Sequence, residues 1–298
     1  MLILIEIGII GLFLATLFYI LKKDKNELYL FLLSFAYAIL FENINILLSL
    51  GKTGGYFYNE NFALYIFHVP LFVTLSWSII IYSSKKIAQN LPIKWFSVIF
   101  AASLLVLLVD LSIDIVAIRL FYWYWIGYEF NEGFFGVPAN NYLGWLLVSF
   151  TFYATCVFFK NKKINSFIKS IVILALSYTI FLFIFLTIDS INMYFNFNKS
   201  QQFITLSFFI IMFLSFIRIE KKATKYELFP FAIRLPFYLF GLISIIAFKL
   251  YTENITILWI SILFILFELL LFLLAWYNEH KQKGKIGNIK ITKKNRLS

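Results

Sequence analysis

The sequence predicts an all-α protein, a polytopic bundle of about nine transmembrane helices. Of its 298 residues, 62% are hydrophobic and only 14% are charged, whereas a soluble domain carries about 25% charged residues. Apolar runs long enough to cross a bilayer, about 20 residues each, recur along nearly the whole chain. These runs are apolar on every face rather than alternating in polarity, which favours helices over membrane strands.

The apolar runs give the expected elements in order. They fall at 2–21, 28–50, 62–83, 95–118, 139–159, 167–189, 202–217, 229–251 and 255–277. The seventh run is the shortest, and without it the count is eight. The first run lacks the basic start and the cleavage site of a signal peptide, so we expect a retained helix. We expect residues 1–277 to form a single transmembrane domain and residues 278–298 to form a basic, disordered tail.

The distribution of basic residues predicts the orientation. Lys and Arg collect on the cytoplasmic side of a membrane, and here they gather in every second connection and in the tail. Nine helices fit this pattern with the N-terminus outside the cell membrane and the C-terminus in the cytoplasm. The net charge of +11 is then a topology signal, reinforced by anionic lipid, and no nucleic-acid partner is expected. The single Cys156 excludes an internal disulfide and a multi-cysteine metal site.

Ionisable residues inside the apolar runs are the first functional clue, because each is costly unless it faces a partner or water. They are Glu6, Glu42, His68, Asp110, Asp114, Asp189 and Glu268. Most of them, together with Asn141, fall in the predicted outer half of the membrane. A lone acid is more often a hydrogen-bonding group in helix packing than a catalyst. A histidine close to a proline, like His68 near Pro70, can satisfy carbonyls that the proline leaves free.

Asp110 and Asp114 form the strongest candidate pair. A spacing of four places both carboxyl groups on one helix face, about 6 Å apart along the axis. Two such anions in a low dielectric cannot both stay charged, so either one carries a proton or a cation lies between them. Arg119 is nine residues beyond Asp110, roughly 14 Å by helical rise, and is not an obvious partner. We therefore expect a functional role for this pair.

Two connections on the same predicted side are rich in aromatic residues. The connection 119–138 is too long for a tight helical hairpin and contains several Tyr, Trp and Phe residues. Such a segment suits the membrane interface, and it equally suits a lid over an apolar ligand. The connection 51–61 is rich in Gly and Tyr. Both alternatives stay open at this stage.

Three stretches carry a resemblance to a known family. The first is Glu42 followed by a Gly- and Tyr-rich loop, and the second is HVPLFVTLSW at 68–77. The third and strongest runs from DLSID at 110–114 through RLFYWYW to GVPANNYLGW at 136–145. Over about residues 40–160 the chain resembles the membrane carotenoid hydratases of the bisanhydrobacterioruberin hydratase type, often described as carotenoid biosynthesis proteins. Ile115 stands where the family usually has proline, and Phe121 where glycine is common.

The resemblance implies a hydro-lyase type of enzyme. It would add water across the terminal 1,2 double bond of an acyclic carotenoid end group, giving a tertiary alcohol, with no cofactor and no metal. Its partners would be a lipid-dissolved carotenoid or isoprenoid and the membrane lipids. The implied catalytic residues are Asp110, Asp114, Glu42 and Asn141. The implied substrate-binding residues are Tyr122, Trp123, Trp125, His68, Tyr56 and Trp145.

Two other functions fit parts of the sequence. A membrane prenyltransferase would use spaced aspartates to hold magnesium on an isoprenoid diphosphate, although such enzymes usually carry a longer aspartate-rich run. A non-enzymatic transporter would also contain buried acids, although no inverted repeat is visible. The sequence leaves open which carotenoid is used, whether one or both ends react, which aspartate holds the proton, and the oligomeric state.

Overall fold

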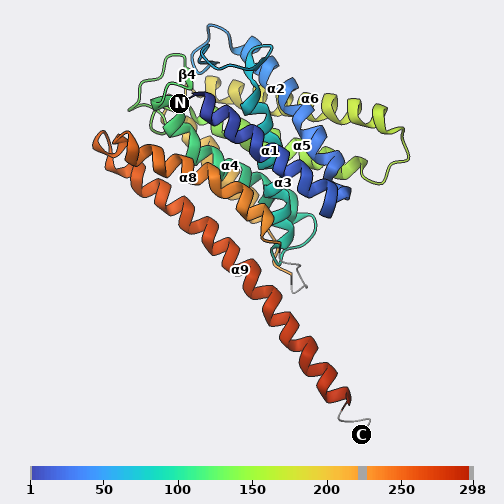
Figure 1. The fold of residues 1–298 in the computed structure, drawn as a ribbon. Coiled ribbons are helices and arrows are strands. Elements are labelled where there is room, and N and C mark those ends of the chain that lie inside the picture. The colour runs from blue at the N-terminus through green and yellow to red at the C-terminus, as the bar shows by residue number, and fades with distance from the viewer. Residues whose placement is uncertain (1, 221–226, 295–298) are drawn as a thin grey trace.

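The chain folds as a bundle of long helices (Figure 1). A computed structural model describes residues 2–220 and 227–294, the side chains of 281–294 excepted. Within this part there are nine α-helices and two short 3-10 helices, η1 (Lys25–Glu27) and η2 (Leu250–Thr252). The α-helices are α1 (Leu2–Lys23), α2 (Leu28–Ser49), α3 (Leu71–Asn90), α4 (Ser97–Arg119), α5 (Ala139–Phe159), α6 (Ser166–Tyr194), α7 (Gln202–Ser215), α8 (Phe229–Ala247) and α9 (Ile255–Lys294). The all-α prediction is confirmed.

Seven of the described helices are long and apolar enough to cross a membrane, which fits a multi-pass membrane protein. The two others are α3 and α7. Helix α7 has only 14 residues and rises about 21 Å, less than the roughly 30 Å of a bilayer core. Helix α3 is long but carries many Ser, Thr and Lys residues. Because most of α3 is buried among other helices, its polar groups contact protein rather than lipid.

The start of α3 differs from the predicted run 62–83. The helix begins at Leu71, immediately after Pro70, because proline tolerates only the start of a helix and restricts the residue before it to extended conformations. Residues upstream form a short antiparallel pair, β2 (Tyr65–Ile66) with β3 (Val69–Pro70). The prediction that His68 lies within a helix is therefore wrong.

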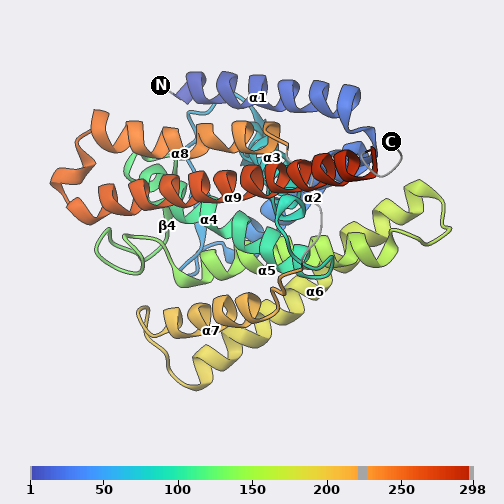
Figure 2. The ribbon, with the colours of Figure 1, turned by 90° about the horizontal axis from the view of Figure 1, so that it is seen from below.

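The packing core lies around α3, α4 and α5. Trp77 and Tyr82 of α3 and Phe152 of α5 are among the largest fully buried side chains. Figure 2 shows α1 at one edge of the bundle and α7 at the opposite edge, with α4 and α5 between them. Helix α1 buries few of its residues, and most of its surface is available to lipid.

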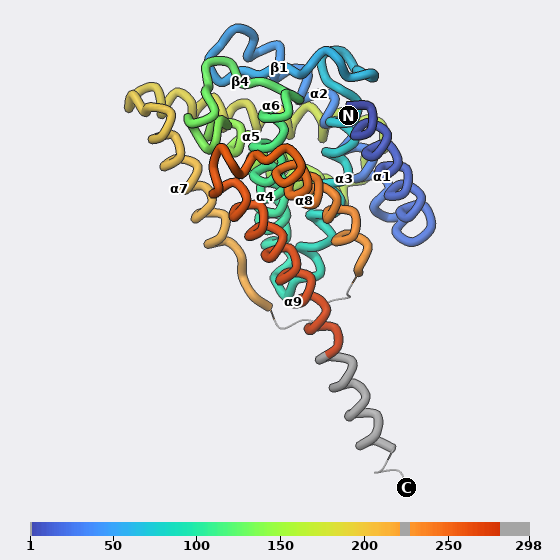
Figure 3. Tube along the Cα trace, turned by 60° about the vertical axis from the view of Figure 1, so that its left-hand side comes forward, coloured from blue at the N-terminus to red at the C-terminus, as the bar shows by residue number. Residues whose placement is uncertain are grey.

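Two connections pair with each other over one end of the bundle. Strand β1 (Tyr56–Tyr58) lies antiparallel to β4 (Trp123–Trp125), with Tyr56 opposite Trp125 and Tyr58 opposite Trp123. We call residues 51–61 and 120–138 the capping loops. Figure 3 shows β1 and β4 at the end where the N-terminus lies. The two aromatic connections thus form one structure that covers the bundle.

Gly136 is required by the way the second capping loop returns to α5. Its backbone adopts φ +94°, and a Cβ there would lie 2.7 Å from the Cδ1 atom of Ile118. Any side chain would therefore be strained twice, by the backbone angle and by the collision. The loop continues through Pro138, which is the N-cap of α5. This tight return places Asn141 in the first turn of the helix.

The C-terminal division of the chain stays a prediction. Helix α9 continues past residue 277 to Lys294, whereas side chains beyond His280 lie outside the described part. The disorder expected for the basic tail, 278–298, concerns mostly residues beyond His280, and it stays a prediction.

Candidate active site

Asp110 and Asp114 lie on one face of α4 and are held by a single amide from α5. Both side chains are buried. The Nδ2 atom of Asn141 donates to Oδ2 of Asp110 at 3.1 Å and to Oδ2 of Asp114 at 2.5 Å. The predicted shared helix face is confirmed. Because one amide contacts both carboxyl groups, the two aspartates and Asn141 form one polar cluster.

The structure excludes Arg119 as the cation between the two carboxyl groups. Its Nε and Nη2 atoms donate to the carboxylate of Glu253 at 2.9 and 2.7 Å. Its Nη1 atom donates to the carbonyl of Phe135 at 2.8 Å. Arg119 therefore ties the end of α4 to the connection before α9 and to a capping loop. Meanwhile Oδ1 of Asp110 is buried without a hydrogen-bond partner among the described groups.

Glu42 of α2 receives three hydrogen bonds from two other elements, β1 and α3. Tyr56 and Tyr58 of β1 donate to its Oε2 atom at 2.5 and 3.1 Å. Trp77 of α3 donates through Nε1 to its Oε1 atom at 2.7 Å. Burial, followed by the nearby carboxylate of Glu42, raises the pKa of both tyrosines well above the ordinary value. The tyrosines thus stay protonated donors at neutral pH and hold the carboxylate in place.

These groups border one small pocket beneath the capping loops. Glu42, Asp114 and Asn141 supply polar groups to a cavity of about 60 Å³. A site of this size admits a few water molecules, since one water needs about 10–15 Å³ of such volume. The aromatic part of the wall consists of Tyr56, Tyr58, Phe72, Trp77, Trp123, Trp125 and Trp145. The pocket therefore combines a place for water with several π faces.

The predicted site residues are partly brought together. Of the predicted substrate-binding residues, Tyr56, Trp123, Trp125 and Trp145 line the pocket. Tyr122 does not; it lines a neighbouring apolar cavity.

His68 does not join the site. Its side chain is exposed, and its backbone N–H donates to Oδ1 of Asn43 at 2.9 Å. It belongs to the connection before α3, outside both cavities.

Two of the three donors to Glu42, Trp77 and Tyr58, were not among the predicted site residues. Both donate to Glu42, and Trp77 also stacks on Trp145 at 3.9 Å between ring centroids. For Tyr58, the sequence signal is its spacing from Tyr56. Tyr56 and Tyr58 are two residues apart, so a strand would direct both toward the same face.

The other acids of the apolar runs have structural partners. The carboxylate of Glu6 accepts the backbone N–H groups of Ala63 and Leu64, both at 3.0 Å, and so fastens the connection before α3 to α1. Asp189 accepts from Nδ2 of Asn140 at 3.3 Å.

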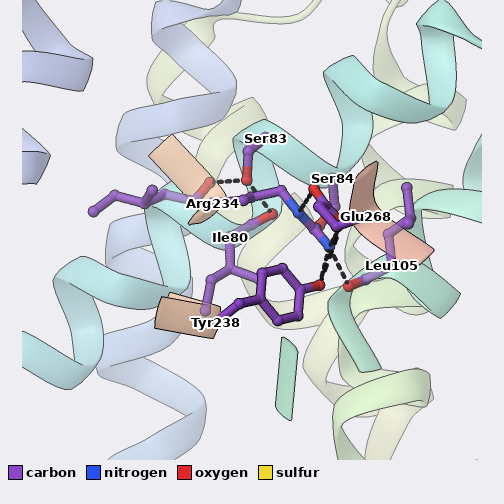
Figure 4. Close-up of polar contacts among 8 residues, drawn as sticks. Ile80, Ser83, Ser84, Leu105, Arg234, Tyr238 and Glu268 are labelled. Carbon is purple, nitrogen blue, oxygen red and sulfur yellow. Dashed lines mark hydrogen bonds and ion pairs between the residues drawn. The ribbon is translucent and has the colours of Figure 1, made fainter. Parts of the chain in front are cut away.

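Glu268 of α9 pairs with Arg234 of α8, with Nε–Oε1 at 2.9 Å, and Figure 4 shows this cluster between the helices. Arg234 also donates to Ser84 at 2.5 Å and to Tyr238 at 2.7 Å. Arg234 was not singled out by the sequence pattern.

The fold and the pocket define a multi-pass membrane protein with an acid cluster at one end of its helix bundle. The sequence model of the family described as "Carotenoid biosynthesis protein" matches residues 2–214, more than half of the chain. The chain belongs to this family and therefore has a role in carotenoid biosynthesis. The match includes every residue of the pocket, whereas α8 and α9 lie beyond it. No curated protein and no solved structure matches the chain.

Proposed function

We propose that this protein hydrates the terminal 1,2 double bond of an acyclic carotenoid, forming a tertiary alcohol. The observation that carries the proposal is the cluster of Asp110, Asp114 and Asn141, which has two buried carboxyl groups and, within the described part of the chain, no cationic side chain between them. Such a pair retains a proton, because two adjacent buried carboxylates repel each other. A proton held next to a water-sized pocket is what alkene hydration requires.

The first chemical step is proton transfer to carbon. One carboxyl group of the pair donates its proton to carbon 2 of the end group, and the π electrons of the double bond form the new C–H bond. Carbon 1 becomes a tertiary cation. The ring faces of Trp123 and Trp125 line the pocket and stabilise this charge, since aromatic faces attract cations.

The second step is capture of the cation by water. A water molecule in the pocket forms the C–O bond to carbon 1 and loses a proton to Glu42. The three donors around Glu42 fix the direction of its carboxylate. The proton then returns through pocket water to the aspartate pair, so one water is added and the protein is unchanged.

The test is expression in a host that makes lycopene, with pigments analysed by mass. The expected product gains the mass of one water for each modified end, and Asp110→Asn, expressed to the same level, leaves the pigment unmodified. An unchanged pigment in cells that contain the folded wild-type protein would overturn the proposal. A gain of an isoprenyl unit that depends on magnesium would indicate the prenyltransferase instead.

We also propose that the capping loops face the outside of the cell membrane, as the distribution of basic residues indicates. Asn59 lies in one capping loop, and Lys163 lies in the connection between α5 and α6. In a Cys156→Ser background, a membrane-impermeant thiol reagent added to intact cells should label Asn59→Cys and not Lys163→Cys. The opposite labelling pattern would reverse the orientation.

A further inference from the structure

A second, much larger cavity lies beside the carboxylate pocket. Its volume is about 480 Å³, and it is bounded by α1, α3, α4, α8 and the start of the second capping loop. Nearly all of its wall is apolar. Helix α1 contributes small side chains, including Gly8, Gly11 and Ala15, and α8 contributes Phe237 and Phe240. A space of this size and character suits a hydrocarbon rather than water.

The large cavity and the carboxylate pocket share one wall. Phe72, Ser76, Ile113 and Trp123 line both spaces. These four side chains therefore form a partition with the acid cluster on one side and the apolar cavity on the other. Ser76 has the smallest side chain in the partition.

The dimensions of the cavity match part of a long chain. Its lining on α1 runs from Ile5 to Ala15, which is about 15 Å by helical rise. That is about half of the roughly 30 Å thickness of a bilayer core. Helix α1 lies at the edge of the bundle (Figure 2), and the cavity is bounded there by α1 and α8. A chain longer than the cavity would extend from it into the surrounding lipid.

The glycines of α1 keep this space open. A Cβ atom added at Gly8 or at Gly11 would meet no other atom within 4 Å. Glycine inside a helix is otherwise unfavourable compared with alanine or leucine. Neither position has a φ angle that requires glycine. Neither close packing nor backbone geometry explains these two glycines, and both border the cavity.

We propose that this cavity binds the hydrocarbon chain of a long conjugated isoprenoid, which enters from the lipid between α1 and α8. The end of the chain reaches the partition and passes it at Ser76, so that the terminal double bond meets the acid cluster. The flat aromatic rings in the wall, from Phe72, Tyr122, Trp123 and Phe240, suit a flat polyene. This inference rests on the proposed function and adds the substrate's route to it.

The shared partition favours this occupant over a phospholipid tail. A lipid tail would fill the cavity equally well, but its end carries no group that the carboxyl groups can act on. An isoprenoid end group carries its reactive double bond at the tip of the chain, where the two spaces meet.

The proposal is tested with substitutions on α1 that place larger side chains in the cavity. Gly8→Leu and Gly11→Leu, singly and together, place a bulky side chain in the open space, and Gly11→Ala adds one methyl group. Folding is expected to survive, because leucine and alanine are better helix formers than glycine. Leu14→Phe is the matched control: it adds bulk to α1 at a position that is 56% exposed and does not line the cavity.

Each variant is purified from the lycopene-producing host, and two quantities are measured. These are the pigment bound per folded protein and the fraction of pigment that has gained water. We expect bound pigment to fall about tenfold or more in the double leucine variant. The two leucine side chains occupy space that the bound chain needs, and overpacking of this kind weakens binding by at least about that factor. The loss should be smaller in Gly11→Ala and absent in Leu14→Phe. Asp110→Asn should keep its bound pigment while forming no product.

The outcomes separate this inference from the proposed function. Folded leucine variants that bind and hydrate as the wild type does would overturn the cavity inference and leave the hydration proposal intact. Pigment binding that depends on Gly8 and Gly11, without any hydration by the wild type, would support the cavity and overturn the hydratase. Loss of a co-purified phospholipid from the leucine variants, with pigment binding unchanged, would overturn the isoprenoid occupant.

Discussion

The Arg234–Glu268 cluster and the Asp110–Asp114 cluster are both buried in the bundle, and their charges are balanced in opposite ways. Arg234 and Glu268 form a complete ion pair with two contacts, at 2.9 and 3.1 Å, and the remaining donors of Arg234 reach Ser84, Tyr238 and the carbonyl of Leu105. Neither member lines a described cavity. This cluster joins α8 and α9 to α3 and α4. Because its charged groups are paired with each other and with protein hydrogen-bond partners, we expect a structural role for it.

Within residues 2–220 and 227–280, no such counter-charge contacts the Asp110–Asp114 cluster. Its only side-chain donor among the described hydrogen bonds is the neutral amide of Asn141, and Asp114 borders a water-sized pocket. Buried charge is costly when uncompensated, so a membrane protein that keeps such a pair gains something other than stability. Under the proposed function, the compensated acid holds helices together, whereas the uncompensated pair beside a cavity supplies the proton for the reaction.

The largest expected effect comes from removing the proton donor. Asp110→Asn and Asp114→Asn keep the size of the side chain and remove the repulsion, so the folded, membrane-inserted protein should be as abundant as the wild type. Product formation should fall about 10²- to 10⁴-fold, the usual value of a general acid. Quantified pigment per folded protein checks this. Full activity in both variants would make the pair structural and move the search for the acid to Glu42.

For the Arg234–Glu268 ion pair we expect a loss of stability rather than a loss of activity. Glu268→Gln leaves the Arg234 charge buried without its counter-charge, and the free energy of unfolding should fall by about 3–5 kcal/mol. Thermal unfolding of the purified protein in detergent measures this, while product per folded molecule should change little. The double variant Arg234→Met/Glu268→Leu should recover most of the stability. A single variant that is fully stable but inactive would place this cluster in the reaction instead.

The helices, and the position of Asp110 and Asp114 on one helix face, could be predicted from the sequence because both follow from local periodicity. The sequence could not supply the β1–β4 pairing, which joins residues about 65 positions apart and is decided by tertiary contacts. Tyr58 was not predicted as a site residue for that reason, since it reaches the carboxylate of Glu42 only once β1 is in place. Arg234 was missed because its partner, Glu268, lies on the next helix.

A smaller loss is expected when one aromatic wall is removed. Trp123→Leu keeps an apolar side chain but removes a π face from the cation, which costs about 0.5–2 kcal/mol, or roughly 2- to 30-fold in rate. Initial rates in membranes that contain matched amounts of protein measure the effect. Trp95→Leu is the control, since Trp95 is 70% exposed and lies before α4. A loss as large as that of Asp110→Asn would contradict the assigned role.

The smallest effect concerns alkaline pH. The pKa values of Tyr56 and Tyr58 are raised by burial and by Glu42, so above about pH 10 the unfolded chain releases protons that the folded chain retains. The unfolded state then binds fewer protons, and stability falls as the pH rises. Melting temperatures should be level below about pH 10 and decline above it, less steeply in Tyr58→Phe. An unchanged slope in that variant would mean that this tyrosine is not buried against the carboxylate.

Transfer of a proton from the aspartate pair to carbon is tested most directly by running the reaction in heavy water. Carboxyl protons exchange with solvent, so the pair would donate deuterium to carbon 2 of the end group. Mass spectrometry should find one deuterium bound to carbon for each hydrated end after the alcohol has been back-exchanged in ordinary water. A tertiary alcohol without any carbon-bound deuterium would show that oxygen was added without protonation of the double bond by a group in exchange with solvent.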